Sequence, residues 1–227
     1  MKRSIIGMLA FLFCALPSLA RAEGDQQEAV DSAYVVVETL QNAPEPGNNV
    51  RNLLHNARGI LIVPELVKGG FIFGAQGGTG VLLARDAQGS WSDPAFFGMG
   101  AASFGFQIGL EESKIILIIM SEKAMQAVMR DEFKIGAEAG IAVATVGGGA
   151  EADTTTHGGA DIYAFSESKG LFGGVAIEGG IMKPRRNYNE AYYGKPVSTQ
   201  EIVLKRVVSN PGADRLRNEL QQISSGK

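Results

Sequence analysis

Residues 69–109, GGFIFGAQGGTGVLLARDAQGSWSDPAFFGMGAASFGFQIG, decide the fold class of this chain. Glycines interrupt short runs of β-branched, aromatic and aliphatic residues, a pattern typical of strands joined by tight turns. Glycine reaches positive φ without steric cost and lets another backbone come close, so this density indicates bends and bulges. The stretch therefore predicts a curved antiparallel sheet.

Helical patterns flank this sheet on both sides. Apolar spacing predicts an amphipathic helix over residues 25–41, and Asn48 or Asn49 caps a second short helix before the first strand. Ser121 caps a mid-chain helix that runs to about Glu132, and the chain turns helical again from Ser198. Strand-like runs fill the remainder: residues 59–64, 70–75, 79–85, 101–110, 114–120, 137–146, 151–156, 161–166 and 171–182.

These elements predict an α+β fold in a single domain. Strand signals about every ten residues indicate a curved antiparallel β-sandwich or a barrel-like sheet. Two N-terminal helices, one mid-chain helix and C-terminal helices accompany it, and Asn210-Pro211 starts the last of these. We place the domain at residues 23–227, with a core at about 30–204 and a C-terminal helical extension at 205–227.

The first 22 residues have the pattern of a secretory signal peptide. Lys2 and Arg3 precede an apolar run over residues 5–16, and Ala20-Arg21-Ala22 is a small-x-small cleavage site. The run is shorter than the roughly 20 residues that a membrane-spanning helix needs. We therefore expect cleavage after Ala22 and a protein that is periplasmic or secreted.

Cleavage changes the composition of the exported chain. It removes 22 of 227 residues, which leaves 205, and with them Cys14, the single cysteine. Loss of Lys2, Arg3 and Arg21 leaves 18 basic against 24 acidic residues, a formal charge near −6. Such a balance argues against nucleic acid as a partner.

Two patterns in the sequence bear on nucleotide binding and on catalysis. Gly78-Thr79-Gly80 leads into the strand-like VLLAR and not into a helix, so no nucleotide and no cofactor is expected. Ser103 lies in a degenerate hydrolase elbow, with His157 and Asp161 downstream as base and orienting group, yet the residues after it are extended and apolar. This makes a serine hydrolase a minor alternative, and we expect no catalytic residue.

Metal sites have little support in this composition. Two histidines and no cysteine in the exported chain exclude a zinc site built from three or four nitrogen or sulfur ligands. Glu151, Asp153 and Asp161 would suit calcium, but the repeated calcium-binding nonapeptide is missing and a solvated acidic loop is the better interpretation.

A basic cluster is the strongest candidate for a binding site. It contains Lys183, Arg185, Arg186 and Lys195, with tyrosines at 188, 192 and 193. Basic residues beside aromatic ones can hold an anionic lipid head group at a membrane surface. The alternative interpretation is an ordinary charged turn after a strand.

Several phrases, taken in order, resemble the SYLF family, a lipid-binding and actin-binding module of eukaryotic trafficking proteins that also has secreted bacterial members. The resemblance covers about residues 30–204, and the joint order and spacing of its phrases is specific. The phrases are Ala57-Arg58-Gly59-Ile60 with Pro64, Lys68-Gly69-Gly70-Phe71, Gly78-Thr79-Gly80-Val81, residues 89–96 (GSWSDPAF), Gln107-Ile108-Gly109, residues 166–175 (SESKGLFGGV), Glu178-Gly179, and Asn189 with Tyr192-Tyr193-Gly194.

This resemblance implies a module without enzymatic activity that binds phosphoinositide-type or other acidic lipids and, in some members, actin filaments. One feature departs from the eukaryotic members, which engage lipid partly through a basic N-terminal helix. Here the acidic residues Glu23, Asp25, Glu28, Asp31 and Glu38 precede the first basic residue of the exported chain, Arg51. An anionic bilayer would repel such a helix.

Two functions follow from these observations. The leading hypothesis is a secreted lipid-binding module of the cell envelope that recognises acidic head groups. The alternative is a structural or stress protein of the envelope that acts through protein contacts, for which an exposed apolar patch around Trp91, Phe96 and Phe97 would be the signal.

Overall fold

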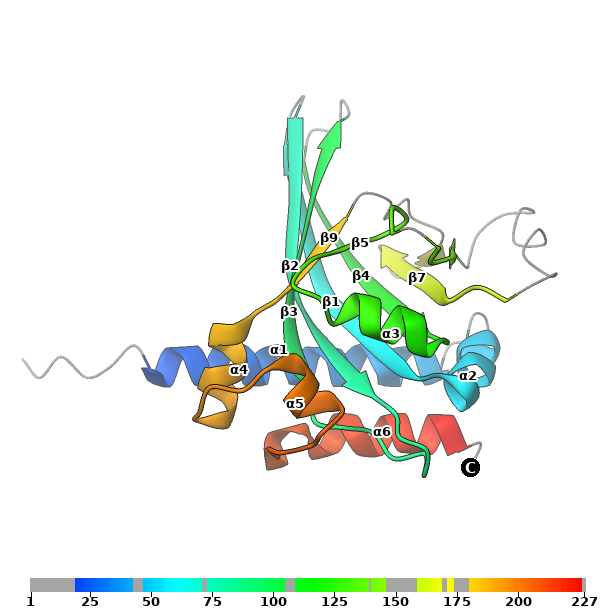
Figure 1. Cartoon of the computed structure of the whole chain (residues 1–227). Helices are drawn as coiled ribbons and strands as arrows, with labels where there is room; N and C mark the ends of the chain where they lie inside the picture. The colour runs from blue at the N-terminus through cyan, green and yellow to red at the C-terminus, as the bar shows by residue number, and fades with distance from the viewer. Residues whose placement is uncertain are drawn as a thin grey trace, which may run out of the picture.

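A single strongly curled sheet with helices on both faces forms the protein (Figure 1). The computed structural model describes residues 19–42, 47–70, 73–104, 109–138, 140–145, 159–168, 171–173 and 180–225. Its helices are α1 (Leu19–Asn42), α2 (Gly47–Asn56), α3 (Glu122–Val128), α4 (Arg186–Tyr193), α5 (Thr199–Val203), the 3-10 turn η1 (Pro211–Ala213) and α6 (Asp214–Ser225).

The described strands pair in the order β5-β9-β3-β2-β1-β4-β7-β6, and β8 pairs with β7. All pairs are antiparallel except β6 with β7, which is parallel. Strands β1, β2 and β3 pair in succession and β4 pairs with the other edge of β1, which fits the glycine-punctuated stretch. The strands are β1 (Gly59–Gly70), β2 (Phe73–Ala84), β3 (Ala95–Phe104), β4 (Gly109–Ile119), β5 (Phe133–Lys134), β6 (Val143–Thr145), β7 (Ile162–Ser168), β8 (Leu171–Gly173) and β9 (Ile181–Pro184).

A β-bulge in β1 bends the centre of the sheet. Between Ile62 and Glu65 the partner in β2 moves by only two residues, from Val81 to Thr79. The pairing with β4 shifts at the same place. One extra residue in β1 is therefore accommodated against both neighbouring strands, which increases local bending and twist.

The bulge explains why glycines are required in β2. A Cβ atom on Gly78 would collide with the carbonyl oxygen of Glu65, and one on Gly80 would lie 2.9 Å from Cγ2 of Val63. Gly77 differs, because the nearest atom to a Cβ there is the carbonyl oxygen of Met99 at 3.7 Å. Of these three glycines, only Gly78 and Gly80, which contact the bulge, leave no room for a side chain.

Each face of the sheet carries its own core. Leu61, Val63 and Leu66 belong to the core that α3 and α5 cover, whereas Ile60 and Ile62 belong to the core under α1, α2, α4 and α6. The extra residue of the bulge returns Leu66 to the face of Leu61 and Val63, since side chains alternate along a strand. Glu65 is left exposed on the side of α1.

The predicted fold class is confirmed, with one sheet and not a two-sheet sandwich. The predicted cap at Ser121 and the predicted helix start at Asn210 are also confirmed, since Ser121 caps α3 and Asn210 caps η1 directly before α6. Ser198 and Glu201 form a capping box on α5, where the chain was expected to turn helical again. These caps satisfy backbone N–H groups that each first helical turn leaves free. The expected cap at Asn48 or Asn49 is wrong, because α2 begins at Gly47 and includes both residues.

Some predicted boundaries were wrong. The three runs over residues 59–85 form two long strands, because the bulge accommodates Pro64, which has no N–H to donate to a ladder. Helix α4 was missed, because its sequence RNYNEAYY was interpreted as part of a charged cluster. The described residues 137, 138 and 140–142 form no strand, and β6 begins only at Val143.

Other predictions fall outside the described residues. These are residues 1–18 of the predicted signal peptide, the strand at 151–156 and residues 174–179 of the run at 171–182. Residues 19–22, which precede the predicted cleavage point, form the first turn of α1.

The bulge predicts opposite effects for two neighbouring substitutions in β2. Gly78→Ala forces the Glu65 carbonyl to move, and we expect it to lower the free energy of unfolding by about 1–3 kcal/mol, as overpacking does. Gly77→Ala meets no close atom and should be neutral or slightly stabilising. Urea unfolding of both variants checks this, and equal effects would contradict the role of the bulge.

Candidate functional site

Two members of the basic cluster are paired with acidic residues of the segment between α3 and β5. Lys183 Nζ lies 2.8 Å from Glu132 Oε2, and Arg186 Nη2 lies 2.6 Å from Asp131 Oδ1. The hydrogen bond and charge of Lys183 lower the pKa of the Glu132 carboxyl. Because each cation faces a carboxylate, this part of the cluster carries little net charge.

Arg185 is held within the protein as well. Its Nη1 donates to the Thr79 hydroxyl at 2.6 Å, and its guanidinium carbon lies 3.2 Å from the ring centroid of Tyr188. Lys195 is exposed just after Gly194, the left-handed C-cap of α4. The structure thus places Lys183, Arg185 and Arg186 at the junction of β9 and α4, with Lys195 at the far end of that helix.

A groove of about 270 Å³ opens beside Arg185, between α1 and the bulge of the sheet. Its floor is formed by Gly77, Gly78 and Thr79 of β2. Tyr188 of α4 forms one wall, and the stacked guanidinium of Arg185 fixes the ring. The remaining walls come from β1 and from α1.

Three carboxylates line this groove: Asp25 and Glu28 on α1 and Glu65 in the bulge. All three side chains are exposed. In the part of the chain that the structure describes, none of them has a salt-bridge or hydrogen-bond partner. The groove is therefore anionic, and two acidic residues of the N-terminal helix, Asp25 and Glu28, contribute to it.

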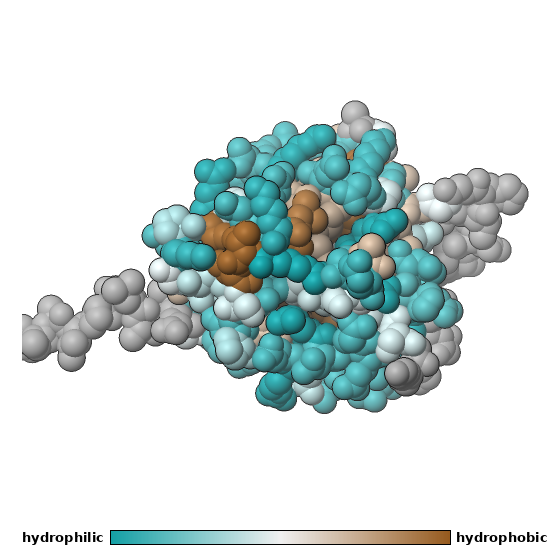
Figure 2. All heavy atoms as spheres, turned by 60° about the horizontal axis from the view of Figure 1, so that its bottom comes forward, coloured by the Kyte–Doolittle hydropathy of each residue, from teal (hydrophilic) through white to brown (hydrophobic). Residues whose placement is uncertain are grey.

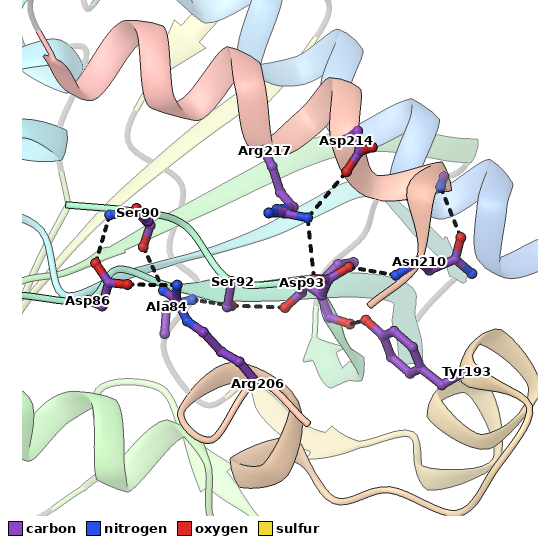
Figure 3. A network of polar contacts seen from close by, with 12 residues as sticks. Ala84, Asp86, Ser90, Ser92, Asp93, Tyr193, Arg206, Asn210, Asp214 and Arg217 are labelled. Carbon is purple, nitrogen blue, oxygen red and sulfur yellow. Dashed lines mark hydrogen bonds and ion pairs between the residues drawn. The ribbon is translucent and has the colours of Figure 1, made fainter. Parts of the chain in front are cut away.

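The phrase Trp91-Ser92-Asp93-Pro94 is a structural clamp, shown in Figure 3 for its polar members. Asp93 Oδ1 accepts the backbone N–H of Asn210 at 2.9 Å, and Arg217 of α6 approaches Oδ2 at 3.4 Å. Tyr193 donates its hydroxyl to the Pro94 carbonyl at 2.6 Å. These bonds join the start of β3 to α4 and to the C-terminal helices.

The other half of the clamp lies around Trp91 and Ser92. The Trp91 indole donates to the Ser224 hydroxyl at 3.0 Å, near the end of α6. The Ser92 hydroxyl accepts from the Ala84 N–H at 3.0 Å and donates to the Asp93 carbonyl at 2.9 Å. Buried polar groups in the clamp thus find partners on separate elements, as burial requires.

Arg206 closes the turn after α5 onto the loop between β2 and β3 (Figure 3). Its backbone has φ of 53°, in the left-handed region, and its guanidinium bonds to Asp86 Oδ2 at 2.6 Å and the Ser90 carbonyl at 2.7 Å. A non-glycine residue in this region costs energy, and the two bonds offset it.

The apolar patch that the alternative, protein-contact function would require is not exposed. Trp91, Phe96 and Phe97 are all buried, with at most 2% of their surface accessible. Phe96 packs edge-on against Tyr192 at a centroid distance of 5.1 Å, which fastens α4 to the sheet. Figure 2 shows a mostly hydrophilic face with compact hydrophobic areas, and the large exposed hydrophobics of the described residues are Val35, Leu204 and Val207.

The hydrolase elbow at Ser103 is not formed. Ser103 pairs with Gly74 inside the continuous strand β3, and not at a strand-to-helix turn. Asp161 accepts the Ser121 hydroxyl at 2.5 Å and the Ala142 N–H at 3.0 Å. These bonds lower the pKa of its carboxyl and give it a structural role at the cap of α3.

His157, Glu151 and Asp153 lie outside the described residues. Among the residues that are described, no three His, Cys, Asp or Glu side chains gather as metal ligands. The described helices also include none that is long and apolar enough to cross a bilayer.

A curled, mainly antiparallel sheet with helices fastened to both faces defines the α+β class of this protein. The family model described as Ysc84, Las17-binding protein actin regulator, matches residues 100–223. The chain is 34% identical to Protein YSC84 of Saccharomyces cerevisiae over 172 residues, 74% of this chain and 36% of the relative. It belongs to the Ysc84 family, also called SYLF.

Other relatives extend the match. The chain is 31% identical to LAS seventeen-binding protein 3 of S. cerevisiae over 173 residues, 75% of this chain and 38% of the relative. It is 25% identical to SH3 domain-containing YSC84-like protein 1 of Bos taurus over 213 residues, 92% of this chain and 61% of the relative. The chain thus spans between about a third and three-fifths of the length of these relatives.

The clamp predicts a large loss of stability for Asp93→Ala. The substitution removes a buried acceptor and leaves the Asn210 N–H and the Arg217 guanidinium without it. We expect the free energy of unfolding to fall by about 2–4 kcal/mol in chemical denaturation. Asp214→Ala removes the exposed partner of the same Arg217 and should cost less than about 1 kcal/mol. Equal losses would contradict a special role for Asp93.

Proposed function

We propose that this chain is an exported, non-enzymatic module of the cell envelope that attaches to a lipid bilayer through one end of its sheet. That end, here called the tongue, comprises the parts of β1–β4 farthest from the helices, namely residues 68–70, 73–76, 101–104 and 109–111. Figure 1 shows these strands continuing past the helices. The observation that carries the proposal is the distribution of charge along them.

The tongue carries charge only at its base, where Lys68 of β1 and Glu111 of β4 are register partners. No charged residue occurs at 69–84 or at 94–110, although charged residues make up 20% of the chain. Lys68 and Glu111 are the first charges on either side. An uncharged projection avoids the cost of bringing ions into the boundary between head groups and acyl chains.

The strand pairing also suits contact with lipid. The register joins Gly70 to Gly74 in β2 and to Gly109 in β4, and it joins Phe73 to Phe104 in β3. Four paired strands bond to one another through their backbone groups, which reduces the unpaired polar groups that a bilayer penalises. The register also brings Phe73 and Phe104, both apolar, to the same end.

The basic cluster has a smaller part in this proposal than the sequence predicts. Lys183 and Arg186 are paired with Glu132 and Asp131, and Arg185 is bonded to Thr79. An anionic head group would have to displace these partners. Lys195 is the member of the cluster that we retain as a head-group contact.

A protein partner is the second candidate function. The family description names a Las17-binding actin regulator, and one relative is called a LAS seventeen-binding protein. These names support contact with another protein as the action of this chain. Chemical cross-linking of the exported protein in intact cells tests this candidate, and absence of any reproducible adduct would count against it.

Vesicle flotation of the exported protein tests the lipid proposal. We expect the double variant Phe73→Ser/Phe104→Ser to lose most of its binding to vesicles of mixed neutral and anionic lipids, because it removes apolar area from the tongue. Leu204→Ser/Val207→Ser removes exposed apolar side chains from the turn after α5 and should float like the unchanged protein.

A charge reversal separates the tongue from the basic cluster. Lys183→Glu/Arg186→Glu should leave flotation within about twofold, because both cations are already paired in the protein. If the charge reversal abolished flotation and the tongue variant did not, the tongue would be the wrong surface.

The export part of the proposal has its own test. Expressed in a Gram-negative bacterium, the protein should appear in the periplasmic fraction with Glu23 as its first residue, as N-terminal sequencing would determine. Ala20→Leu/Ala22→Leu spoils the small-x-small site and should leave an uncleaved, membrane-associated precursor. A cytoplasmic protein that begins at Met1 would contradict export.

A further inference from the structure

The groove between α1 and the bulge is a surface that neither the lipid proposal nor the family description uses. We propose that it binds a lysine or arginine side chain presented by a polypeptide partner. Four elements build it, since α1, β1, β2 and α4 each contribute lining residues. The inference stands on the shape of the groove, on its charge and on its fixed floor.

The shape is set by the fold and not by loose side chains. Gly77, Gly78 and Thr79 form the floor, and Gly77, which lies on the same face as Thr79, has no side chain to fill the space. Thr79 is held by Arg185 at 2.6 Å, and the same guanidinium stacks on Tyr188. The groove is therefore formed before any partner arrives, which limits the entropic cost of binding.

The size favours a side chain over a free small molecule. At about 270 Å³ the groove is smaller than the roughly 300–1,000 Å³ of pockets that enclose a small-molecule ligand. One long side chain fits this space, and the backbone that presents it would remain at the surface.

The charge selects a cation. Asp25, Glu28 and Glu65 face the groove from two elements, and Arg185 behind Tyr188 is the one described cation in contact with its lining. Two or three carboxylates around one opening can accept the several N–H donors of a guanidinium or ammonium group. The edge of Tyr188 and the methylene groups of Glu28 and Glu65 can pack along the apolar stem of such a side chain.

The test uses the full chain and a fluorescent octapeptide of alternating glycine and arginine, followed by fluorescence polarisation. We expect salt-sensitive binding that Glu28→Gln/Glu65→Gln weakens about tenfold, since two ionic contacts are lost while side-chain volume is kept. Glu38→Gln/Glu190→Gln is the matched control. Both of its residues lie on α1 and α4 but outside the groove lining, and it removes the same charge. It should bind like the unchanged protein.

A blocking variant tests the shape separately from the charge. Gly77 has no close neighbour at its Cβ position and shares a face with Thr79, so Gly77→Val places a side chain at the groove floor without changing any charge. We expect at least a tenfold loss of peptide binding with an unchanged circular dichroism spectrum. If that variant fails to fold, the two glutamine variants decide the question.

Four results would overturn the inference. They are no measurable binding by the unchanged protein, equal weakening by the groove variant and its control, equal binding of a glycine-glutamate octapeptide, and competition by free arginine at the same concentration as the peptide. The second result would indicate general charge attraction, and the last would indicate a small-molecule site.

Discussion

The extra residue in β1 between Ile62 and Glu65 is the constraint on which the rest of the architecture depends. It shifts the register against β2 and β4 at the same level, and so divides the central strands into a base packed between helices and a projecting tongue. It makes Gly78 and Gly80 obligatory and returns Leu66 to the core of Leu61 and Val63. It also presents Glu65 beside α1, where the groove lies. A single inserted residue therefore connects the glycine pattern, the curvature and both candidate binding surfaces.

The clamp at Trp91–Pro94 fastens helices to the base of the sheet, from which the tongue projects. Asp93, Trp91 and Pro94 each bond to a residue that follows much later in the chain. Burial raises the pKa of the Tyr193 hydroxyl, and the nearby Asp93 charge raises it further, so the hydroxyl remains a donor to the Pro94 carbonyl at neutral pH. Phe96 and Phe97 add apolar burial at the same place. The phrase that best marks the family is thus a device of folding, and binding is left to other surfaces.

Local chemistry allowed much of the fold to be predicted. The cap at Ser121 and the helix start at Asn210 were recognisable because their side chains bond to N–H groups only two or three residues away. Glycine density predicted curvature because glycine tolerates bends and close backbone contacts. Pro64 misled the strand prediction because its tolerance depends on a bulge formed jointly by three strands. Helix α4 was missed because its stability comes from tertiary contacts, such as Asn189 with the Phe96 N–H and Tyr192 against the Phe96 ring.

The candidate sites were harder to predict for a related reason. Lys183 and Arg186 stand out as cations in the sequence, but their partners Glu132 and Asp131 lie about fifty positions earlier and meet them only through the pairing of β5 with β9. The groove brings together Asp25, Glu65 and Tyr188, which no local motif connects. The sequence has no charged residue at 69–84 or 94–110, but it does not show that parts of these runs project beyond the helices.

Hydrogen–deuterium exchange of the exported protein, with and without vesicles of mixed neutral and anionic lipids, tests the central claim most directly. If the tongue enters the lipid surface, amides in residues 73–76 and 101–104 should gain protection, while those in residues 183–186 should change little. Protection confined to residues 183–186 would contradict the account and return the lipid site to the junction of β9 and α4.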